Sequence, residues 1–387
     1  MDYRGYDRVG TAPGVRNYLA ILPTVGCANG VALDISNEVE GARPLLHHQG
    51  CGQLSPDLAR VQRVLAGLAD NPNVGAVLIV NLECGSTNPE EIKAGMASSK
   101  PVEVINILEL GGAVAARSRG VQVASRLCSE LDDSRRKAEA SNLIVGVKCG
   151  ASDATSGIAS NPATGVAVDM LIEAGGTVIF GETTELLGAE HVIADRAASE
   201  EVKGELLGRV EKLEERIKAE GVDLRGSQPS AGNIEGGLTT IEEKSLGAIA
   251  KSGTKDIQGV LEYGDNPPDS GLYFMDSGAR EMELLTGLGA SGSHIILFST
   301  GLGAPQGFPF CPVLKISGNG HTTEHICDHI DLDVSTIVEG TESIEQAGER
   351  IFQEVLKVAS GAQVKAERIG YDNSGVNSDI YTTGPIV

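Results

Sequence analysis

Three cysteines stand at the ends of apolar, strand-like runs of the sequence. The runs and the thiols that close them are 19–27 with Cys27, 77–84 with Cys84, and 143–149 with Cys149. In open α/β sheets, ligands bind beyond the carboxyl ends of the strands, so these thiols lie at the usual position of the ligand-binding site. Thiolates are nucleophiles and soft metal ligands. The pattern therefore predicts a reactive or metal-binding edge.

A fourth thiol, Cys51, lies in a polar loop with the sequence HHQGCGQ (47–53). His47 and His48 precede it, and an imidazole and a thiolate together suit one metal ion. A single free cysteine is more often a small buried side chain than a ligand. Core packing alone does not require four thiols in this arrangement, so the set predicts a metal or iron–sulfur site.

A carboxylate and a lysine follow strand-like runs in the same way. Glu182 comes shortly after the run 176–180, and an acid there can bind a hard cation, accept a proton or cap the next helix. The loop that starts at Lys148 and passes Asp153 presents hydroxyls, backbone N–H groups and one ammonium group. Such a loop is a suitable cradle for a carboxylate or a sulfonate. It lacks the glycine patterns of nucleotide-binding loops.

Three histidines, His321, His325 and His329, recur at helical spacing and could bind zinc from one helix face. The residues between them are weak helix formers, and no HExxH glutamate is present. We therefore interpret them as part of a solvent-exposed face. No segment resembles a GxSxG elbow, so no serine triad is predicted.

The segments that position these residues alternate between short apolar runs and longer stretches with helical spacing. This order predicts an α/β fold with mainly parallel sheets flanked by helices. The clearest helix is predicted for 197–221. The predicted strands are 18–25, 74–82, 102–108, 142–147, 176–180, 271–274, 294–299 and 313–316.

The chain is expected to form two α/β domains, an N-terminal one at 1–140 and a C-terminal one at 141–387. A length of 387 residues is compatible with two or three domains. The boundary is placed near residue 140 because a charged, helix-like stretch at 129–141 separates two strand-rich regions. A glycine-rich stretch at 227–240 is predicted to be an active loop or a further boundary.

Composition excludes several classes of protein. The 31 basic and 53 acidic residues give a net charge of 31 − 53 = −22, which argues against a nucleic-acid partner. No apolar run approaches the roughly 20 residues that a membrane-spanning helix needs. We expect no secretory signal and a cytoplasmic location. Seven cysteines, an odd number, do not suggest a disulfide framework.

The chain resembles the altronate and galactarate dehydratase family over essentially its whole length. The matching segments are 5–6, 14–18, 22–29, 48–53, 71–74, 147–150, 152–153, 156–157, 159–162, 181–183, 236–240 and 243–247. Together these motifs are highly specific. The resemblance implies an iron-dependent lyase that acts on a 2-hydroxy carboxylate.

On this resemblance, we expect iron to be held by thiols and a few polar side chains to carry the chemistry. Three thiolates alone would favour a four-iron cluster with one open corner, whereas mixed ligation would favour a single Fe²⁺ ion, and the sequence leaves both open. The expected metal ligands are Cys51, Cys84 and Cys149, with Cys27 or His48 in addition. The expected catalytic residues, which supply base, acid and anchoring, are Lys148, Asp153, Glu182 and His48.

The family's single-chain dehydratases carry an extra small β-rich domain ahead of this core. Here residues 5–6 start the core at once, so we expect a separate small subunit and a hetero-oligomer. The segment 7–14 also differs from the family's short arginine-bearing turn, which leaves the roles of Arg8 and Arg16 in substrate binding open.

The family includes two-subunit sulfolactate sulfo-lyases and split altronate dehydratases, which share one elimination. The C2 proton is removed, a group on C3 departs, and the resulting enol becomes a 2-keto acid; a cation must absorb the developing charge. We expect (2R)-3-sulfolactate to give pyruvate and sulfite. The alternative is loss of water from altronate or galactarate, which gives a 2-keto-3-deoxy sugar acid. A binding or assembly subunit without catalytic activity is a further alternative, which iron analysis would separate.

Overall fold

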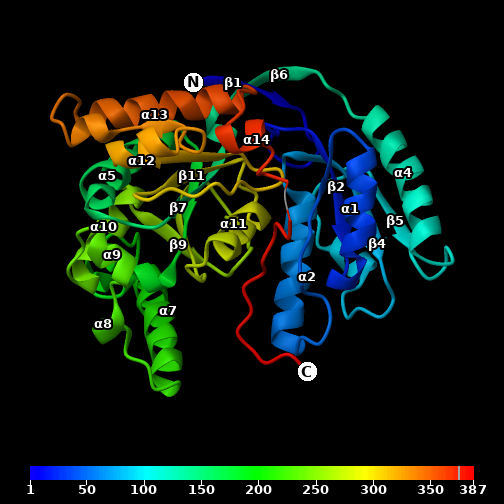
Figure 1. The fold of residues 1–387 in the computed structure, drawn as a ribbon, viewed down its shortest axis with the longest axis horizontal. Helices are drawn as coiled ribbons and strands as arrows, with labels where there is room; N and C mark the ends of the chain where they lie inside the picture. Colours follow the sequence, from blue (N-terminus) through cyan, green and yellow to red (C-terminus); the bar gives the residue numbers. More distant parts are fainter. Residues whose placement is uncertain (374) are drawn as a thin grey trace.

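The protein contains two parallel sheets and one short antiparallel pair of strands (Figure 1). The structure is a computed structural model and describes residues 1–373 and 375–387. Both parallel sheets are flanked by helices, which confirms the α/β fold that the alternating sequence pattern predicts.

The first sheet has four parallel strands, in the order β3 (Ala42–Pro44), β2 (Tyr18–Pro23), β4 (Val74–Asn81) and β5 (Val102–Asn106). One face is covered by α1 (Asn29–Glu38) and α4 (Ala113–Ser129), and the other by α2 (Ser55–Asp70) and α3 (Pro89–Ala94). Because both faces are covered, β4 is apolar almost throughout and buried along its length.

The second sheet has seven parallel strands with β7 at its centre. Their order is β13 (Leu332–Asp333), β12 (Val313–Ser317), β11 (Ile295–Ser299), β7 (Ile144–Cys149), β8 (Thr177–Phe180), β10 (Gly271–Met275) and β9 (Ile257–Leu261). Helices α5 (Asn161–Glu173) and α13 (Ile344–Ala359) cover one face, and α11 (Glu281–Ala290) covers the other. The remaining helices are α6 (Glu190–Ala194), α7 (Glu200–Ala219), α8 (Leu224–Ser227), α9 (Ala231–Glu235), α10 (Ile241–Ile249), α12 (Gly320–His325) and α14 (Lys365–Ile369).

Helices α2 and α11 pack against each other between the two sheets (Figure 1). Leu65 and Leu68 of α2 and Leu285 and Leu288 of α11 are fully buried in one apolar cluster with strands of both sheets. Each such side chain stabilises the fold by about 1.5–3 kcal/mol. The two sheets therefore share a core.

The helix-like stretch expected at 129–141 is wrong, because only its first residue is in an α-helix. Helix α4 ends at Ser129, and residues Arg135–Glu139 form strand β6, which pairs antiparallel with β1 (Asp2–Tyr6). Lys137 and Asp2 form a 2.8 Å ion pair across this ladder. Pairing with the distant N-terminal segment supplies the hydrogen bonds, so a highly charged sequence becomes a strand.

The segment 227–240, expected to be an irregular loop, contains α9 and the end of α8. Over the described part of the chain, none of the helices combines the length and the apolar character needed to cross a lipid bilayer.

Asn73 connects the two sheets through its buried side-chain amide. Its Oδ1 accepts hydrogen bonds from the backbone N–H groups of Val15 and Arg16, and its Nδ2 donates to the carbonyls of His294 and Phe310, each at 2.8 Å. Asn73 is fully buried, so no water can replace these bonds without rearrangement.

We expect Asn73→Ala to lower the free energy of unfolding by about 3 kcal/mol, because it leaves several buried backbone groups without partners. Urea unfolding monitored by circular dichroism measures this loss. Asn266→Ala is the matched control at an exposed site, where we expect a change within about 0.5 kcal/mol. Equal effects of the two substitutions would contradict the assigned role of Asn73.

Candidate functional site

A carboxylate and two ammonium groups form a buried charge cluster at the carboxyl ends of β7 and β8. The Glu182 carboxylate accepts hydrogen bonds from Lys148 Nζ at 3.1 Å and from Lys251 Nζ at 2.7 Å. The three side chains are at most 3% exposed. Lys251 comes from the 3₁₀ turn η5 (Ala250–Ser252), which follows α10. The carboxylates of Glu281 and Glu185 also act on Lys148 and Lys251, so the ammonium groups of the cluster face more than one negative charge.

The charge cluster sets the ionisation of its members. Burial alone would raise the pKa of Glu182, but the ammonium groups of Lys148 and Lys251 outweigh burial and hold the pKa well below its usual range. Burial acts to lower the pKa of Lys148, but Glu182 reverses this effect. Glu182 is therefore a carboxylate and Lys148 an ammonium group at neutral pH.

Cys149 lies against this charge cluster rather than in open solvent. Its Sγ is 2.9 Å from Lys251 Nζ, and its backbone N–H donates to Glu182 at 3.1 Å. Burial raises the pKa of the Cys149 thiol to about 12, and Glu182 adds to the rise while Lys251 opposes it. The thiol is therefore protonated at neutral pH in the metal-free chain.

The backbone at Glu182 is strained. Its φ of 73° is the only positive value among the described residues other than glycine. Two contacts from the end of β10 hold the turn: Ser277 Oγ accepts from the Glu182 backbone N–H at 2.9 Å, and Thr183 Oγ1 donates to Asp276 at 2.7 Å. A residue in such a rare backbone conformation costs about 1–3 kcal/mol, and the conformation persists only where surrounding contacts hold it. Residues of this kind are concentrated at functional sites.

The other three predicted thiols lie on three adjoining loops at the carboxyl edge of the four-stranded sheet. We call these segments the thiol loops: residues 24–28 with Cys27, 47–53 with Cys51, and 82–87 with Cys84. Backbone hydrogen bonds join them, from the Gly26 N–H to the Gln49 carbonyl at 2.9 Å and from the Ser86 N–H to the Gly50 carbonyl at 2.7 Å. All three cysteines are exposed. In the part of the chain that the structure describes, no hydrogen bond connects Cys149 to these loops.

Ion pairs lead from the thiol loops toward the charge cluster. His48 Nε2 lies 3.4 Å from the Asp379 carboxylate, and Arg280 lies 3.2 Å from the same carboxylate. Arg280 immediately precedes α11, and the next residue, Glu281, is close enough to influence the pKa of Lys148. The side chains of His48 and Arg280 are 55% and 75% exposed. This row of ion pairs therefore presents accessible polar groups between the two sheet edges.

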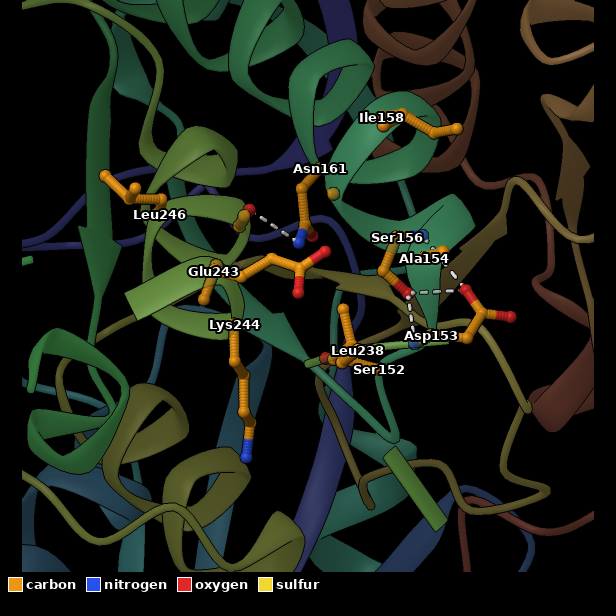
Figure 2. A pocket seen from close by; sticks show the side chains of 13 residues that line it. Ser152, Asp153, Ala154, Ser156, Ile158, Asn161, Leu238, Glu243, Lys244 and Leu246 are labelled. Atoms are coloured by element: carbon orange, nitrogen blue, oxygen red, sulfur yellow. Dashed lines mark hydrogen bonds between the residues drawn. The ribbon is translucent and has the colours of Figure 1, made fainter. Parts of the chain in front are cut away.

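Asp153 lines a separate cavity of about 280 Å³ between the loop after β7 and α10 (Figure 2). Its Oδ1 accepts from the Ser156 N–H at 3.0 Å and from Thr155 at 2.6 Å, and its Oδ2 accepts from Asn319 at 2.7 Å. The cavity is polar on this side, with Ser152, Ser156, Asn161, Glu243 and Lys244 among its lining residues. The structure thus joins Lys148 to Glu182, and places Asp153 and His48 elsewhere.

Sequence reasoning missed Lys251 and Lys315. Lys251 is one lysine in the otherwise small and apolar stretch 245–253, and that isolated charge was the available signal. Lys315 stands beside Phe298, which stands beside Lys148, in register across β12, β11 and β7. Burial lowers the pKa of Lys315 to about 8, although Asp331 and Glu281 oppose the shift.

We expect Glu182→Gln to destabilise the protein by about 3–5 kcal/mol at pH 7, because two buried ammonium groups lose their counter-charge. The folded pKa of Glu182 is lowered, so its stabilisation is complete above the ordinary value of 4.5 and is lost as the pH falls through the lower folded value. The variant should therefore lose less stability on acidification than the parent. Urea unfolding at pH 7 and at a series of pH values below 4.5 measures both effects.

The exposed Glu83 offers a control, since Glu83→Gln should change the free energy of unfolding by less than about 0.5 kcal/mol. If Glu182→Gln had the same free energy of unfolding as the parent at pH 7, the ion pairs of Glu182 with Lys148 and Lys251 would not stabilise the fold.

Two family models cover most of the chain. Residues 5–132 match the second domain of the D-galactarate dehydratase/altronate hydrolase family, and residues 140–382 match the C-terminal domain of D-galactarate/altronate dehydratase.

Curated relatives match nearly the full chain. The chain is 38% identical to (2R)-sulfolactate sulfo-lyase subunit beta of Chromohalobacter salexigens, over 95% of both chains. It is 31% identical to altronate dehydratase and 34% identical to galactarate dehydratase (L-threo-forming) of Escherichia coli, over 94% and 93% of this chain and 75% and 73% of theirs. These relatives are named as a sulfo-lyase and as dehydratases, which are lyases that release water. The chain therefore belongs to the D-galactarate/altronate dehydratase family and is a lyase.

Proposed function

We propose that the chain is the large, catalytic subunit of an iron-dependent lyase that converts (2R)-3-sulfolactate to pyruvate and sulfite. The sulfo-lyase subunit beta matches along 95% of its own length, whereas the altronate and galactarate dehydratases extend beyond the matched part. That relative is named as one subunit of its enzyme, so the proposal includes a separate small subunit and a hetero-oligomer.

The observation that carries this proposal is the row of ion pairs between the two sheet edges. Arg280, Asp379 and His48 connect the start of α11 to the thiol loops, and Glu281, next to Arg280, acts on Lys148 of the charge cluster. A substrate with a carboxylate and a sulfonate is dianionic, so it suits an exposed guanidinium such as that of Arg280. We place the substrate at this row.

The reaction breaks two bonds and forms one. A base takes the C2 proton, the electron pair of the C2–H bond forms the C2–C3 double bond, and the C3–S bond breaks as sulfite leaves with its electron pair. The enol then takes a proton at C3, loses the proton of its 2-hydroxyl group and becomes pyruvate. Negative charge develops next to the substrate carboxylate as C2 loses its proton, so catalysis requires cationic groups at that position.

His48 is assigned as the base and Arg280 as the carboxylate anchor. His48 Nε2 lies 3.4 Å from the Asp379 carboxylate and 3.2 Å from Gln49 Nε2, and the exposed imidazole can accept the C2 proton on its unprotonated ring nitrogen. The planar guanidinium of Arg280 suits a carboxylate; it pairs with Glu283 at 3.0 Å and with Asp379 at 3.2 Å, and its side chain is exposed to an incoming substrate. Lys148 and Lys251, fixed by Glu182, contribute positive potential. Asp153 holds the loop after β7 in place through Ser156 and Asn319.

The thiol loops fit iron by the chemistry of their donors. Cys27, Cys51 and Cys84 are exposed and lie on adjoining loops, and soft thiolates are good iron ligands. Cys149, buried against Lys251, does not suit this role. When bound, iron supplies a Lewis acid for the 2-hydroxyl and the carboxylate of the substrate.

An assay that offers sulfolactate, altronate and galactarate separately tests the substrate. The chain is purified without oxygen together with any subunit that co-purifies, and sulfite, pyruvate and 2-keto-3-deoxy acids are measured. We expect sulfite and pyruvate in equal amounts from (2R)-3-sulfolactate only. Formation of a 2-keto-3-deoxy acid from either sugar acid, without sulfite release from sulfolactate, would favour a dehydratase and contradict the proposal.

Kinetics of two variants test the assigned roles. We expect His48→Gln to lower kcat by about 10²- to 10⁴-fold, as for loss of a general base. Arg280→Met should mainly raise KM, by about tenfold or more, because a charged anchor is lost. His325→Gln, at an exposed site on α12, is the matched control and should leave both constants unchanged. An unchanged kcat for His48→Gln would exclude the imidazole as the base.

A further inference from the structure

The side-chain amide of Gln49 uses all of its hydrogen-bonding groups. Its nitrogen lies 3.2 Å from both the Ile380 carbonyl and His48 Nε2, and its oxygen accepts a hydrogen bond from the Gln53 amide. Gln49 is only 2% exposed, so water does not replace these partners. The imidazole that we assign as the base is therefore in contact with an amide nitrogen, which can donate a hydrogen bond but cannot accept one.

Two backbone groups decide which end of the Gln49 amide faces His48. The Gly50 N–H donates to the Gln53 side-chain oxygen at 3.1 Å, so Gln53 presents its nitrogen to Gln49. The Ile380 carbonyl accepts from the Gln49 nitrogen. A flipped Gln49 amide would place its oxygen against the Ile380 carbonyl and its nitrogen against the Gln53 nitrogen, and both bonds would be lost. The nitrogen of Gln49 therefore faces His48.

The backbone of Gln49 is held as firmly as its side chain. Its N–H donates to His47 Nδ1 at 3.2 Å, and its carbonyl accepts from the Gly26 N–H at 2.9 Å. His47 is fully buried, and its Nε2 lies 2.8 Å from the Pro23 carbonyl. Burial lowers the pKa of His47 to about 4, so this ring is neutral at neutral pH and accepts at Nδ1 while it donates at Nε2. Gln49 is thus fixed on a rigid support.

The contact with Gln49 determines where neutral His48 carries its proton. A ring nitrogen that accepts a hydrogen bond has a lone pair and no proton, so the lone pair is on Nε2 and the proton is on Nδ1. The Asp379 carboxylate does not reverse this assignment. It is 3.4 Å from His48 Nε2, beyond the usual hydrogen-bond distance of about 2.7–3.2 Å, and it is shared with Arg280.

We propose that Gln49, oriented by Gln53, is a positioning residue that keeps the lone pair of His48 on Nε2, so that Nε2 takes the C2 proton. This inference rests on the proposed function for the role of His48 as the base. The arriving proton breaks the hydrogen bond from Gln49, because two N–H groups then face each other. The imidazolium carries a proton on each nitrogen and one positive charge, and Asp379 at 3.4 Å stabilises that charge.

NMR measures the position of the His48 proton without any substrate. The full chain is prepared free of metal with ¹⁵N-labelled histidine rings, and the signals of His48 are those that are absent from His48→Gln. At about pH 8.5 a histidine of ordinary pKa is neutral, and a ring nitrogen with a lone pair resonates well downfield of one with a proton. We expect the lone pair on Nε2. A lone pair mainly on Nδ1 in the parent chain would overturn the proposal, whatever the variants show.

Substitutions at the two glutamines test the cause of this preference. Gln49→Met removes the donor and leaves the Asp379 carboxylate to attract a proton to Nε2, so we expect the tautomer ratio to shift toward protonated Nε2 by about tenfold or more. Gln53→Met frees the Gln49 amide to rotate and should cause a smaller shift in the same direction. Gln353→Met, at an exposed site on α13, is the matched control and should leave the ratio unchanged. An unchanged ratio in Gln49→Met would overturn the assigned role.

Kinetics test whether the tautomer matters for the reaction. In the sulfite assay, Gln49→Met should lower kcat by about tenfold or more and change KM by less than about twofold, because Arg280 still binds the substrate carboxylate. Circular dichroism checks that each variant has the fold of the parent. A higher KM with an unchanged kcat would assign Gln49 to substrate binding and overturn its role in positioning the base.

These readouts separate the role of Gln49 from the proposed function. A parent chain that releases no sulfite from sulfolactate, but loses the Nε2 lone pair in Gln49→Met, would retain the tautomer assignment and lose the proposed function. A chain that releases sulfite and depends on His48, but keeps its tautomer ratio and kcat in Gln49→Met, would retain the proposed function and lose this inference.

Discussion

The Glu182 carboxylate, held between Lys148 and Lys251 away from water, is the interaction on which the active edge of the large sheet depends. Removing three charges from water is costly unless they satisfy one another, and here one anion serves two cations while a backbone N–H supplies a further bond. This arrangement involves a left-handed residue after β8, and burial together with Glu182 raises the pKa of the neighbouring Cys149 thiol.

The packing of α2 against α11 determines the position of the carboxyl edge of the seven-stranded sheet relative to the four-stranded sheet. Because both helices bury apolar faces in one shared core, the start of α11 and the thiol loops come close enough for Asp379 to contact both Arg280 and His48. The chemistry that we propose depends on groups from both sheets. Neither half of the chain contains all of them.

Much of the fold could be predicted from the sequence because central parallel strands are apolar on both faces, and the eight predicted strands all exist. The edge strands β3, β9 and β13 and the charged pair β1 and β6 were missed, since their pairing partners and not their own composition make them strands. The sequence placed Lys148 and Glu182 at strand ends. It could not show Lys251 or Asp379, which reach the site only through the packing of distant segments.

The central claim is that the substrate binds between the thiol loops and the start of α11. A crystal structure of the iron-loaded chain with (2R)-3-sulfolactate, prepared without oxygen, tests it most directly. We predict the substrate carboxylate within hydrogen-bond distance of Arg280, C2 facing His48, and iron bound to Cys27, Cys51 and Cys84. A substrate bound instead in the cavity lined by Asp153 and Asn161 (Figure 2), with no metal at the thiol loops, would contradict the account.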